Sequence, residues 1–270
     1  MVQHYLLASD FDQTLSFNDS GVVLAELIGV HGFPDKVRGL AQINLVQQGA
    51  ELSYLILHDP EFRRVRNYHL VEAGKQIRLK HDVALFAKTL ETLAEGYQFN
   101  FHVISAAPQE IIQSALEGIV PADHIFGTRF RYNEATGEVQ SIIRASAGWG
   151  KITVLEELRA QLGISHDQII YMGDGSSDLP VMMHVNQYDG LTIAVSESNF
   201  ITRVAKRTVL SENAMSVLVP VLENVLRWDS ARIRRLFASY GLTLLEWEKR
   251  RTDMLTIQES GIALASTQPQ

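Results

Sequence analysis

The sequence predicts a doubly wound α/β protein built on a parallel sheet, and three observations indicate this fold class. Short apolar runs of about four or five residues recur along the chain and are typical of strands buried on both faces. Each run ends in small or acidic residues, which is typical of the loop that follows a strand. Helical patterns separate the runs, and this alternation predicts parallel strands joined by helices that cover the sheet.

Four strands and four connecting helices are predicted from these patterns. The helix over 83–95 has its apolar residues on one face, and the helix over 109–117 follows Pro108, which suits a helix start. The helix over 151–162 ends at Gly163, a natural C-cap, and a fourth helix over 179–184 follows the third strand. The predicted strands cover residues 5–9, 101–104, 168–172 and 191–195.

Two regions interrupt this alternation. Residues 16–82 are too long for a simple crossover between the first two strands, and helical patterns within them cover 22–28, 37–48 and 60–72. Alternation around residues 133–137 predicts a β-hairpin over 126–143. We therefore expect three parts: a core of residues 1–15 and 83–228, a helical cap over 16–82, and a C-terminal helical extension over 229–270 with a mobile end.

The composition excludes several classes of protein and site. The 270 residues include no cysteine, which excludes disulfides, a thiolate nucleophile and a cysteine-based zinc site. Against 31 Asp and Glu there are 24 Lys and Arg, and the net charge of −7 argues against nucleic acid or an anionic membrane as partner. No signal peptide or membrane-spanning run is recognisable, so a cytoplasmic location is expected.

The placement of four polar residues indicates where the chemistry lies. Asp10 and Asp12 follow the first predicted strand, Ser105 follows the second, and Asp174 follows the third between two glycines. Ligands of an open parallel sheet bind beyond the carboxyl ends of its strands, so these side chains converge on one crevice if the strands are neighbours. Clustered carboxylates repel one another unless a cation lies between them, and oxygen ligands suit Mg²⁺.

This cluster of residues suits phosphoryl transfer. With a metal ion flanked by Asp10 and Asp174, one carboxylate can attack phosphorus, because the substrate dianion no longer repels it. Another carboxylate is placed to protonate the leaving alkoxide and later to activate water. Thr14 and Ser105 are candidates to hold phosphoryl oxygens, and Lys151 can offset charge between the nucleophile and the phosphate.

The same residues match a family pattern. DFDQT at 10–14 fits a DxDx[TV] motif, Ser105 follows a hydrophobic strand, Lys151 opens a helix, and GDGSSD at 173–178 fits a GDxxxD motif. With these four motifs in order, the chain resembles the haloacid dehalogenase-like phosphatases, especially the phosphoserine phosphatase-like branch, over roughly residues 3–228. The resemblance implies a Rossmann-like core, with the helical insert as the family's smaller cap domain.

The resemblance also implies a role for each matching residue. Asp10 would be the nucleophile that forms an aspartyl-phosphate, and Asp12 would be the general acid and base, with its backbone carbonyl on Mg²⁺. Asp178 would support the site either from the metal side or from behind the metal ligands. The implied metal site comprises Asp10, Asp12, Asp174 and Asp178. The implied phosphate- and substrate-binding residues are Thr14, Asp19, Ser105, Ala106 and Lys151.

Several positions depart from the family pattern. Ala106 and Ala107 stand where the branch usually has two glycines, Ser177 stands where Asn is common, and Gln13 replaces a frequent Gly or Ser. The cap arginine that recognises the substrate carboxylate in phosphoserine phosphatases has no match near 52–57. Three arginines that lie further on are candidates to replace it: Arg63, Arg64 and Arg66. Phosphoserine is therefore one candidate substrate among several.

Structural interpretations compete with these functional ones. Asp19, Ser105 and Asp178 each lie where a residue can cap a following helix. The nine histidines form no HxxxH or HxH pair, so surface or structural positions are expected for them. Three arginines within 232–235 fit a solvated helix face, while the apolar residues after them fit packing on the core or on a second subunit.

The expected function is that of a Mg²⁺-dependent phosphatase, which hydrolyses a phosphomonoester of a small metabolite. Two alternatives stay open: a phosphotransferase or phosphomutase on the same scaffold, and a non-catalytic phospho-acceptor module. The expected partner is a small phosphorylated metabolite, not nucleic acid or a membrane, and a homodimer formed through residues 229–270 is a further open alternative.

Overall fold

The computed structural model describes residues 2–244, and a seven-stranded sheet lies at its centre. The strands are β1 (Gln3–Ser9), β2 (Tyr97–Pro108), β3 (Ile125–Tyr132), β4 (Val139–Arg144), β5 (Ile169–Gly173), β6 (Leu191–Ala194) and β7 (Arg207–Thr208). Their order across the sheet is β4-β3-β2-β1-β5-β6-β7, and all neighbours are parallel except β3 and β4. This order, in which the chain turns back at β1, confirms the predicted doubly wound fold.

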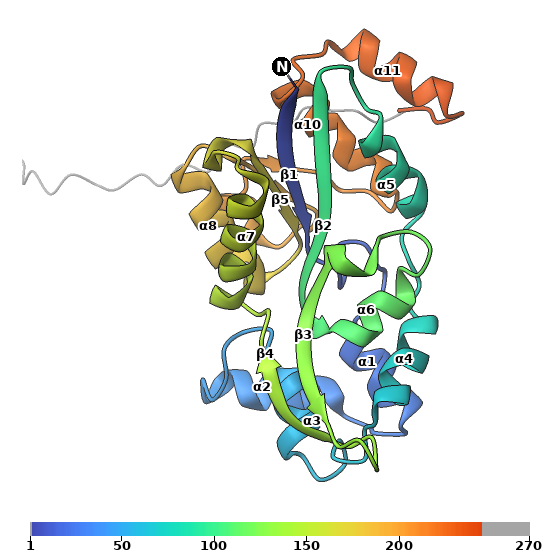
Figure 1. Ribbon diagram of the computed structural model, residues 1–270, viewed down its shortest axis with the longest axis vertical. Helices are drawn as coiled ribbons and strands as arrows, with labels where there is room; N and C mark the ends of the chain where they lie inside the picture. The colour runs from blue at the N-terminus through green and yellow to red at the C-terminus, as the bar shows by residue number, and fades with distance from the viewer. Residues whose placement is uncertain (1, 245–270) are drawn as a thin grey trace, which may run out of the picture. The chain divides into compact units, whose positions relative to one another are not determined.

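Helices cover both faces of the sheet (Figure 1). They are α5 (Val83–Glu91), α6 (Gln109–Ala115), α7 (Trp149–Leu162), α8 (Leu179–Gln187), α9 (Asn199–Val204) and α10 (Leu218–Asn224). On one face α5 and α6 pack against β2 and β3, and on the other face α7 and α8 pack against β1, β5 and β6. The four connecting helices predicted from the sequence are confirmed in position.

Side chains alternate between these two faces along the central strands. Leu6 and Ala8 of β1 are fully buried in one apolar cluster with Val154 of α7. On the opposite face Phe101 of β2 contacts Phe86 of α5 edge-on, with ring centroids 5.4 Å apart. Because both faces are buried, the strands read as continuous apolar runs instead of alternating ones.

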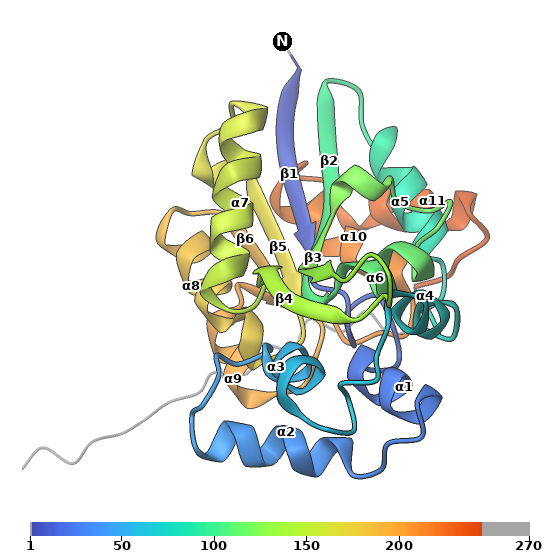
Figure 2. The ribbon, with the colours of Figure 1, turned by 60° about the horizontal axis from the view of Figure 1, so that its bottom comes forward.

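Four further helices lie between β1 and α5, beyond the carboxyl ends of the strands (Figure 2). They are α1 (Ser20–Leu27), α2 (Phe33–Gln42), α3 (Glu51–His58) and α4 (Asn67–Lys75). They share an apolar cluster of buried residues that includes Leu24, Leu55 and Leu70, together with Phe130 of β3. The predicted helical insert is therefore present, and its core is continuous with the hairpin strand.

Within this insert two predicted helix ranges were wrong and one helix was missed. The range 37–48 overshoots α2, because Pro34 starts the helix earlier and Asn44, with φ +47°, lies beyond its end. The range 60–72 begins too early, because the Asp59 carboxylate accepts the Glu61 N–H at 2.9 Å and holds a turn there. The helix α3 has no counterpart among the helical patterns of the sequence.

The predicted hairpin is confirmed as the antiparallel pair of β3 and β4. The Asn133 side chain accepts the N–H groups of Ala135 and Thr136 at 2.9 and 3.0 Å, which forms the turn between the strands. In addition, β3 pairs with β2, so the hairpin extends the main sheet instead of standing apart.

Residues up to Arg227 form one compact unit, and a second unit begins at Trp228. The second unit contains α11 (Ser230–Ser239), which Asp229 caps by accepting the Arg232 N–H at 2.7 Å. The predicted mobile end of the chain lies outside the described residues, 2–244, and so does most of the predicted dimer-forming segment. Between residues 2 and 244 no helix combines the length and apolarity that crossing a membrane requires.

Candidate active site

The first acidic motif begins where β1 ends, in the middle of the sheet. β1 pairs with β2 on one side and with β5 on the other. The Asp10 N–H donates to the Met172 carbonyl at 2.9 Å, which continues the β1–β5 ladder by one residue. The strand order therefore brings the segments that carry Asp10, Ser105 and Asp174 to the same edge of the sheet, as the sequence predicted.

The loop after Asp10 turns back tightly on itself. The N–H groups of Thr14 and Leu15 both donate to the Phe11 carbonyl, at 3.2 and 2.9 Å. Gln13 lies within this turn at φ +55°, in the left-handed region that a side chain rarely adopts. This conformation explains why a glycine suits the position in the family pattern.

Asp10 is buried and held on both carboxylate oxygens. Its Oδ1 accepts the Phe11 N–H at 2.7 Å, and its Oδ2 lies 3.0 Å from Nζ of Lys151. Burial, followed by the charge of Asp178, raises the pKa of Asp10 to about 6 despite the nearby ammonium group. The two contacts therefore fix the orientation of the carboxylate. The raised pKa indicates that Lys151 compensates its negative charge only in part.

Lys151 is fully buried between two carboxylates. Its Nζ donates to Asp178 Oδ1 at 2.6 Å and also contacts Asp10. Burial lowers the pKa of Lys151, but the charges of Asp10 and Asp178 outweigh this effect and raise the pKa above its ordinary value. The ammonium group thus remains charged inside the protein and ties α7 to the ends of β1 and β5.

Asp178 uses both oxygens to hold the surrounding loop. Besides Lys151, the Tyr171 hydroxyl donates to its Oδ1 at 2.6 Å, and the N–H groups of Asp174 and Gly175 donate to its Oδ2 at 3.2 Å. A Cβ at Gly173 would lie 2.4 Å from this carboxylate, so glycine is required there. With its oxygens engaged in this way, Asp178 positions Lys151 and Asp174.

Asp12 lies just before the helical insert and is hydrogen-bonded to the first residue of its first helix, α1. Its Oδ1 accepts the Ser20 N–H at 2.9 Å and the Ser20 hydroxyl at 2.6 Å. Burial and then the charge of Asp19 raise the pKa of Asp12 well above its usual value. A raised pKa favours the protonated form of the carboxyl group, which is the form that a general acid needs.

Asp10, Asp174 and Asp178 form the acidic group that fits a metal ion. Each offers one carboxylate oxygen, and these oxygens all lie within 4.8 Å of one another. Burial and then the charges of Asp10 and Asp178 raise the pKa of Asp174 to about 7, so a bound cation would favour its charged form. Asp10 and Asp174 line a cavity, whereas Asp178 is fully buried and binds Lys151, Tyr171 and backbone N–H groups; Asp10 and Asp174 are therefore the side chains best placed to bind Mg²⁺.

A cavity of about 520 Å³ opens over these residues. Six of the site residues predicted from the sequence lie on its wall, namely Asp10, Asp12, Asp19, Ser105, Ala106 and Asp174. Asp19 at the same time caps α1, because its carboxylate accepts the Val22 N–H at 3.0 Å. The structure places Thr14, Lys151 and Asp178 behind this wall, with Thr14 Oγ1 3.4 Å from Asp174 Oδ1.

Ser105 lies at an irregularity in the sheet. The register between β2 and β3 shifts between Ile104 and Pro108, and the Ser105 side chain is buried there. Its Oγ accepts the Ala107 N–H at 3.3 Å, so the hydroxyl shapes the turn within β2. Such irregularities reorient side chains, and this one brings Ser105 and Ala106 onto the wall of the cavity.

Two further residues, Glu51 and Tyr171, shape the site without having been predicted from the sequence. Glu51 of α3 lines the cavity and binds the Gly49 N–H at 2.7 Å, and Tyr171 supports Asp178 from inside β5. Nothing in the local pattern marked either residue, because α3 was not predicted and Tyr171 reads as an ordinary strand residue. The arginines proposed as carboxylate partners do not line the cavity: Arg63, Arg64 and Arg66.

The fold and the acidic site point to a class of hydrolases. A family model described as haloacid dehalogenase-like hydrolase matches residues 7–183. This match spans more than half of the chain. The chain belongs to the haloacid dehalogenase-like hydrolase family, as the four motifs predicted. No protein among those with curated functions matches the sequence significantly.

Solved structures share this fold at low sequence identity. A substrate-bound phosphoserine phosphatase complex matches with TM-score 0.64 and 19% identity, over 81% of this chain and 99% of that chain. A phospho-aspartyl intermediate analogue of phosphoserine phosphatase matches with TM-score 0.63 and 20% identity, over 80% and 98%. A haloacid dehalogenase family hydrolase from Salmonella enterica subsp. enterica serovar Typhi matches with TM-score 0.65 and 17% identity, over 83% and 73%.

Proposed function

We propose that the protein is a Mg²⁺-dependent phosphatase that hydrolyses a phosphomonoester of a small metabolite through an aspartyl-phosphate on Asp10. One observation carries the proposal: Asp10, oriented by Lys151, lies on the same cavity wall as Asp12, a second carboxyl group whose burial favours its protonated form. A nucleophile and a proton donor on one wall are the two groups that this reaction requires.

The proposed reaction has two steps. A carboxylate oxygen of Asp10 attacks phosphorus, the bond from phosphorus to the ester oxygen breaks, and Asp12 gives its proton to that oxygen as the alcohol leaves. Asp12 then takes a proton from water, which attacks phosphorus and releases inorganic phosphate and free Asp10. Mg²⁺ held by Asp10 and Asp174 would supply charge neutralisation of the phosphoryl oxygens.

One structural relative supports the covalent step. That relative is a phosphoserine phosphatase with an analogue of its phospho-aspartyl intermediate. In this chain the buried Lys151 beside Asp10 is suited to keep a carboxylate oriented toward phosphorus. Ser105 and the backbone near Ala106 are the groups of the cavity wall best placed to bind phosphoryl oxygens.

The charges of the cavity wall suggest the class of leaving group. Asp19 and Glu51 line the part of the cavity formed by the insert, beside apolar side chains such as Phe33 and Leu52. No Lys or Arg lies among the described lining residues, so a substrate carboxylate would lack an ionic partner there. We therefore favour a neutral or amine-bearing alcohol as the leaving group over serine, which bears a carboxylate. We propose that the substrate is a soluble metabolite of the cytoplasm.

A screen of phosphorylated compounds tests this proposal. We expect Mg²⁺-dependent release of phosphate from an aryl phosphate, loss of that activity in EDTA, and at least a thousandfold loss in Asp10→Asn. Asp35→Asn, at an exposed position of α2, should keep full activity. Within the screen, phosphoethanolamine should be hydrolysed more efficiently than phosphoserine.

The outcomes separate the proposal from its alternatives. Phosphate that moves to an added alcohol in preference to water would identify a phosphotransferase. If Asp10 becomes phosphorylated while the Mg²⁺-loaded protein turns over no phosphomonoester, the protein is a phospho-acceptor and the proposal is overturned. A preference for phosphoserine would overturn only the assignment of the leaving group.

A further inference from the structure

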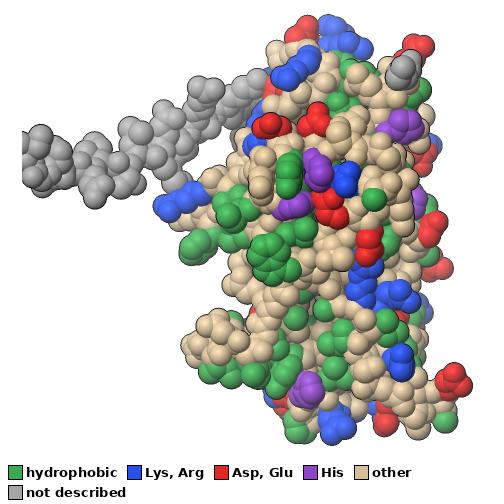
Figure 3. Space-filling model, turned by 60° about the vertical axis from the view of Figure 1, so that its left-hand side comes forward, with side chains coloured by type: hydrophobic (Ala, Val, Ile, Leu, Met, Phe, Trp, Pro, Cys, Tyr) green, Lys and Arg blue, Asp and Glu red, His purple; other side chains and the backbone are tan. Residues whose placement is uncertain are grey.

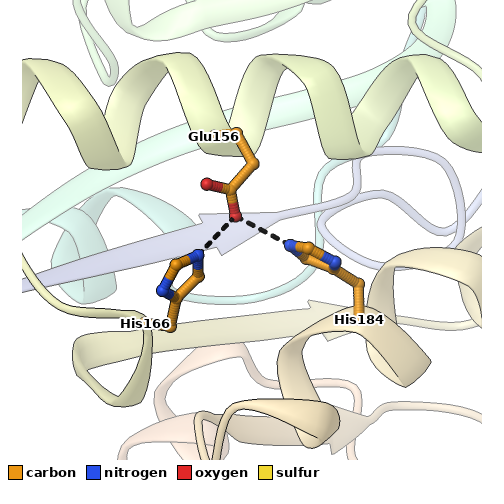
Figure 4. A group of neighbouring side chains, drawn as sticks. All are labelled: Glu156, His166 and His184. Atoms are coloured by element: carbon orange, nitrogen blue, oxygen red, sulfur yellow. Dashed lines mark hydrogen bonds and ion pairs between the residues drawn. The ribbon is translucent and has the colours of Figure 1, made fainter.

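A second group of potential metal ligands lies away from the acidic site. Glu156 of α7, His166 of a short 3₁₀ helix (His166–Gln168) and His184 of α8 converge on one point (Figure 4). His166 immediately precedes β5, whereas Asp174 follows the same strand. The group therefore lies toward the opposite end of β5 from the catalytic carboxylates, and the proposed phosphatase reaction does not use it.

The three side chains point toward one another through single atoms. Nε2 of His184 lies 2.7 Å from Oε1 of Glu156, and Nε2 of His166 lies 3.2 Å from the same oxygen. Ligand atoms around a tetrahedral ion with bonds of about 2.0–2.1 Å are separated by roughly 3.4 Å. Small side-chain adjustments would therefore bring Oε1 of Glu156 and the two Nε2 atoms to the separations of ligands around one tetrahedral ion.

Neighbouring contacts hold these side chains in place. The His166 ring stacks on Tyr188 with centroids 4.4 Å apart, and the His184 ring meets Tyr188 edge-on at 5.3 Å. Nε of Arg159 donates to Oε2 of Glu156 at 2.7 Å, which leaves Oε1 directed at both imidazoles. Partners that orient the ligands in this way are typical of metal sites.

The group is reachable from solvent. The exposed fractions of the three side chains are 29% for Glu156, 33% for His166 and 20% for His184. On the face that Figure 3 shows, histidine side chains lie beside acidic ones at the surface. An ion can therefore enter, and water can complete its coordination.

We propose that Glu156, His166 and His184 form a site for Zn²⁺ or a similar divalent transition metal, distinct from the Mg²⁺ site. Two imidazoles and one carboxylate are a ligand set that zinc accepts, with a water as fourth ligand. The bound ion joins α7, α8 and the segment before β5. Lys151 lies on α7, Asp178 immediately precedes α8, and Asp174 immediately follows β5, so the ion would link the elements that position the acidic site.

Equilibrium dialysis with Zn²⁺ on the full chain, after removal of any histidine tag, tests the proposal. Asp174→Asn in excess Mg²⁺ serves as background, so that the acidic site contributes little zinc binding. We expect one Zn²⁺ per chain in this background, and at least tenfold weaker binding after His166→Gln or His184→Gln. His31→Gln, at an exposed position outside the group, is the matched control and should bind zinc normally.

Two further measurements do not depend on activity. Zn²⁺ should raise the melting temperature of the background protein and of the His31→Gln control, but not of the His184→Gln variant. Co²⁺ should give the intense visible absorption of a four- or five-coordinate site, and Glu156→Gln should alter that spectrum. If no zinc binds, or if binding is equal in all the histidine variants, the site is an ordinary ion pair and the proposal is overturned.

Discussion

The ammonium nitrogen of Lys151 lies 3.0 Å from a carboxylate oxygen of Asp10, and both side chains are buried. The same nitrogen lies 2.6 Å from Asp178, so one cation serves two carboxylates inside the protein. Lys151 does not line the cavity, and its charge acts on the site through the oxygen of Asp10. Lys151 therefore stabilises the fold as well as orienting Asp10.

Replacing Lys151 by Met should destabilise the fold. Methionine has nearly the same volume but leaves two buried carboxylates without their cation, and breaking a buried ion pair costs about 3–5 kcal/mol. Urea unfolding at pH 7 measures the loss. The control is Lys36→Met, because Lys36 pairs with Asp59 and Glu61 near the surface and should cost less than about 1 kcal/mol. Equal losses in the two variants would contradict the role given to Lys151.

If Asp12 is the proton donor, the loss of rate in Asp12→Asn should depend on the leaving group of the substrate. An alkyl phosphate needs protonation of the leaving oxygen, so its kcat should fall by about 10²–10⁴. An aryl phosphate with an acidic phenol leaves without such help and should lose much less in the step that forms the aspartyl-phosphate. Rapid-quench measurement of that step compares the two substrates. Equal losses for both would show that Asp12 does not act as the general acid.

Gly49→Ala tests whether the loop before α3 shapes the cavity. Gly49 has φ +90°, and a Cβ there would lie 3.2 Å from the Cβ atoms of Ala106 and Ser177. The loop must shift away from the site, so KM should rise several-fold with a smaller change in kcat. Gly39→Ala, within α2 and with open space around it, should leave both constants unchanged and stabilise the helix by about 0.5–1 kcal/mol. An unchanged KM in Gly49→Ala would exclude this role for the loop.

His102 should make folding stability depend on pH. Burial and then the charge of His124 lower the pKa of His102 to about 4, from an ordinary value near 6.5. Between these values the unfolded chain binds the proton and the folded protein does not, so this contribution is present above pH 6.5 and is lost as pH falls toward 4. His102→Gln should reduce the decline in unfolding free energy between pH 7 and pH 4.5 by about 2 kcal/mol.

The control for this pH experiment is His31→Gln, since His31 is exposed. That variant should follow the wild-type pH dependence of unfolding free energy. Because buried carboxyl groups such as Asp174 change stability in the opposite direction, only the difference between variant and wild type is informative. A His102→Gln curve parallel to the wild-type curve would refute the assignment.

The sequence predicted the elements of the sheet better than those of the insert. Strands buried on both faces appear as apolar runs, so β1 and β5 were found within one or two residues of their observed bounds. The helix α3 was missed because its residues pack against other parts of the insert and of β3, and no local signal marks its start. Helix boundaries near Asp59 likewise depended on a side chain that binds the backbone.

By itself, the sequence determined the fold class and the residues at the ends of its central strands, because apolar periodicity and acidic loops are local properties. Tertiary structure alone decided that Asp178 holds Lys151, that Glu51 enters the cavity, and that Glu156 meets His166 and His184. These relationships join residues on different elements, and helix packing sets the distances between them. No spacing along the chain encodes such distances. For this reason the sequence shows His166 and His184 as isolated histidines, whereas the structure brings them together with Glu156.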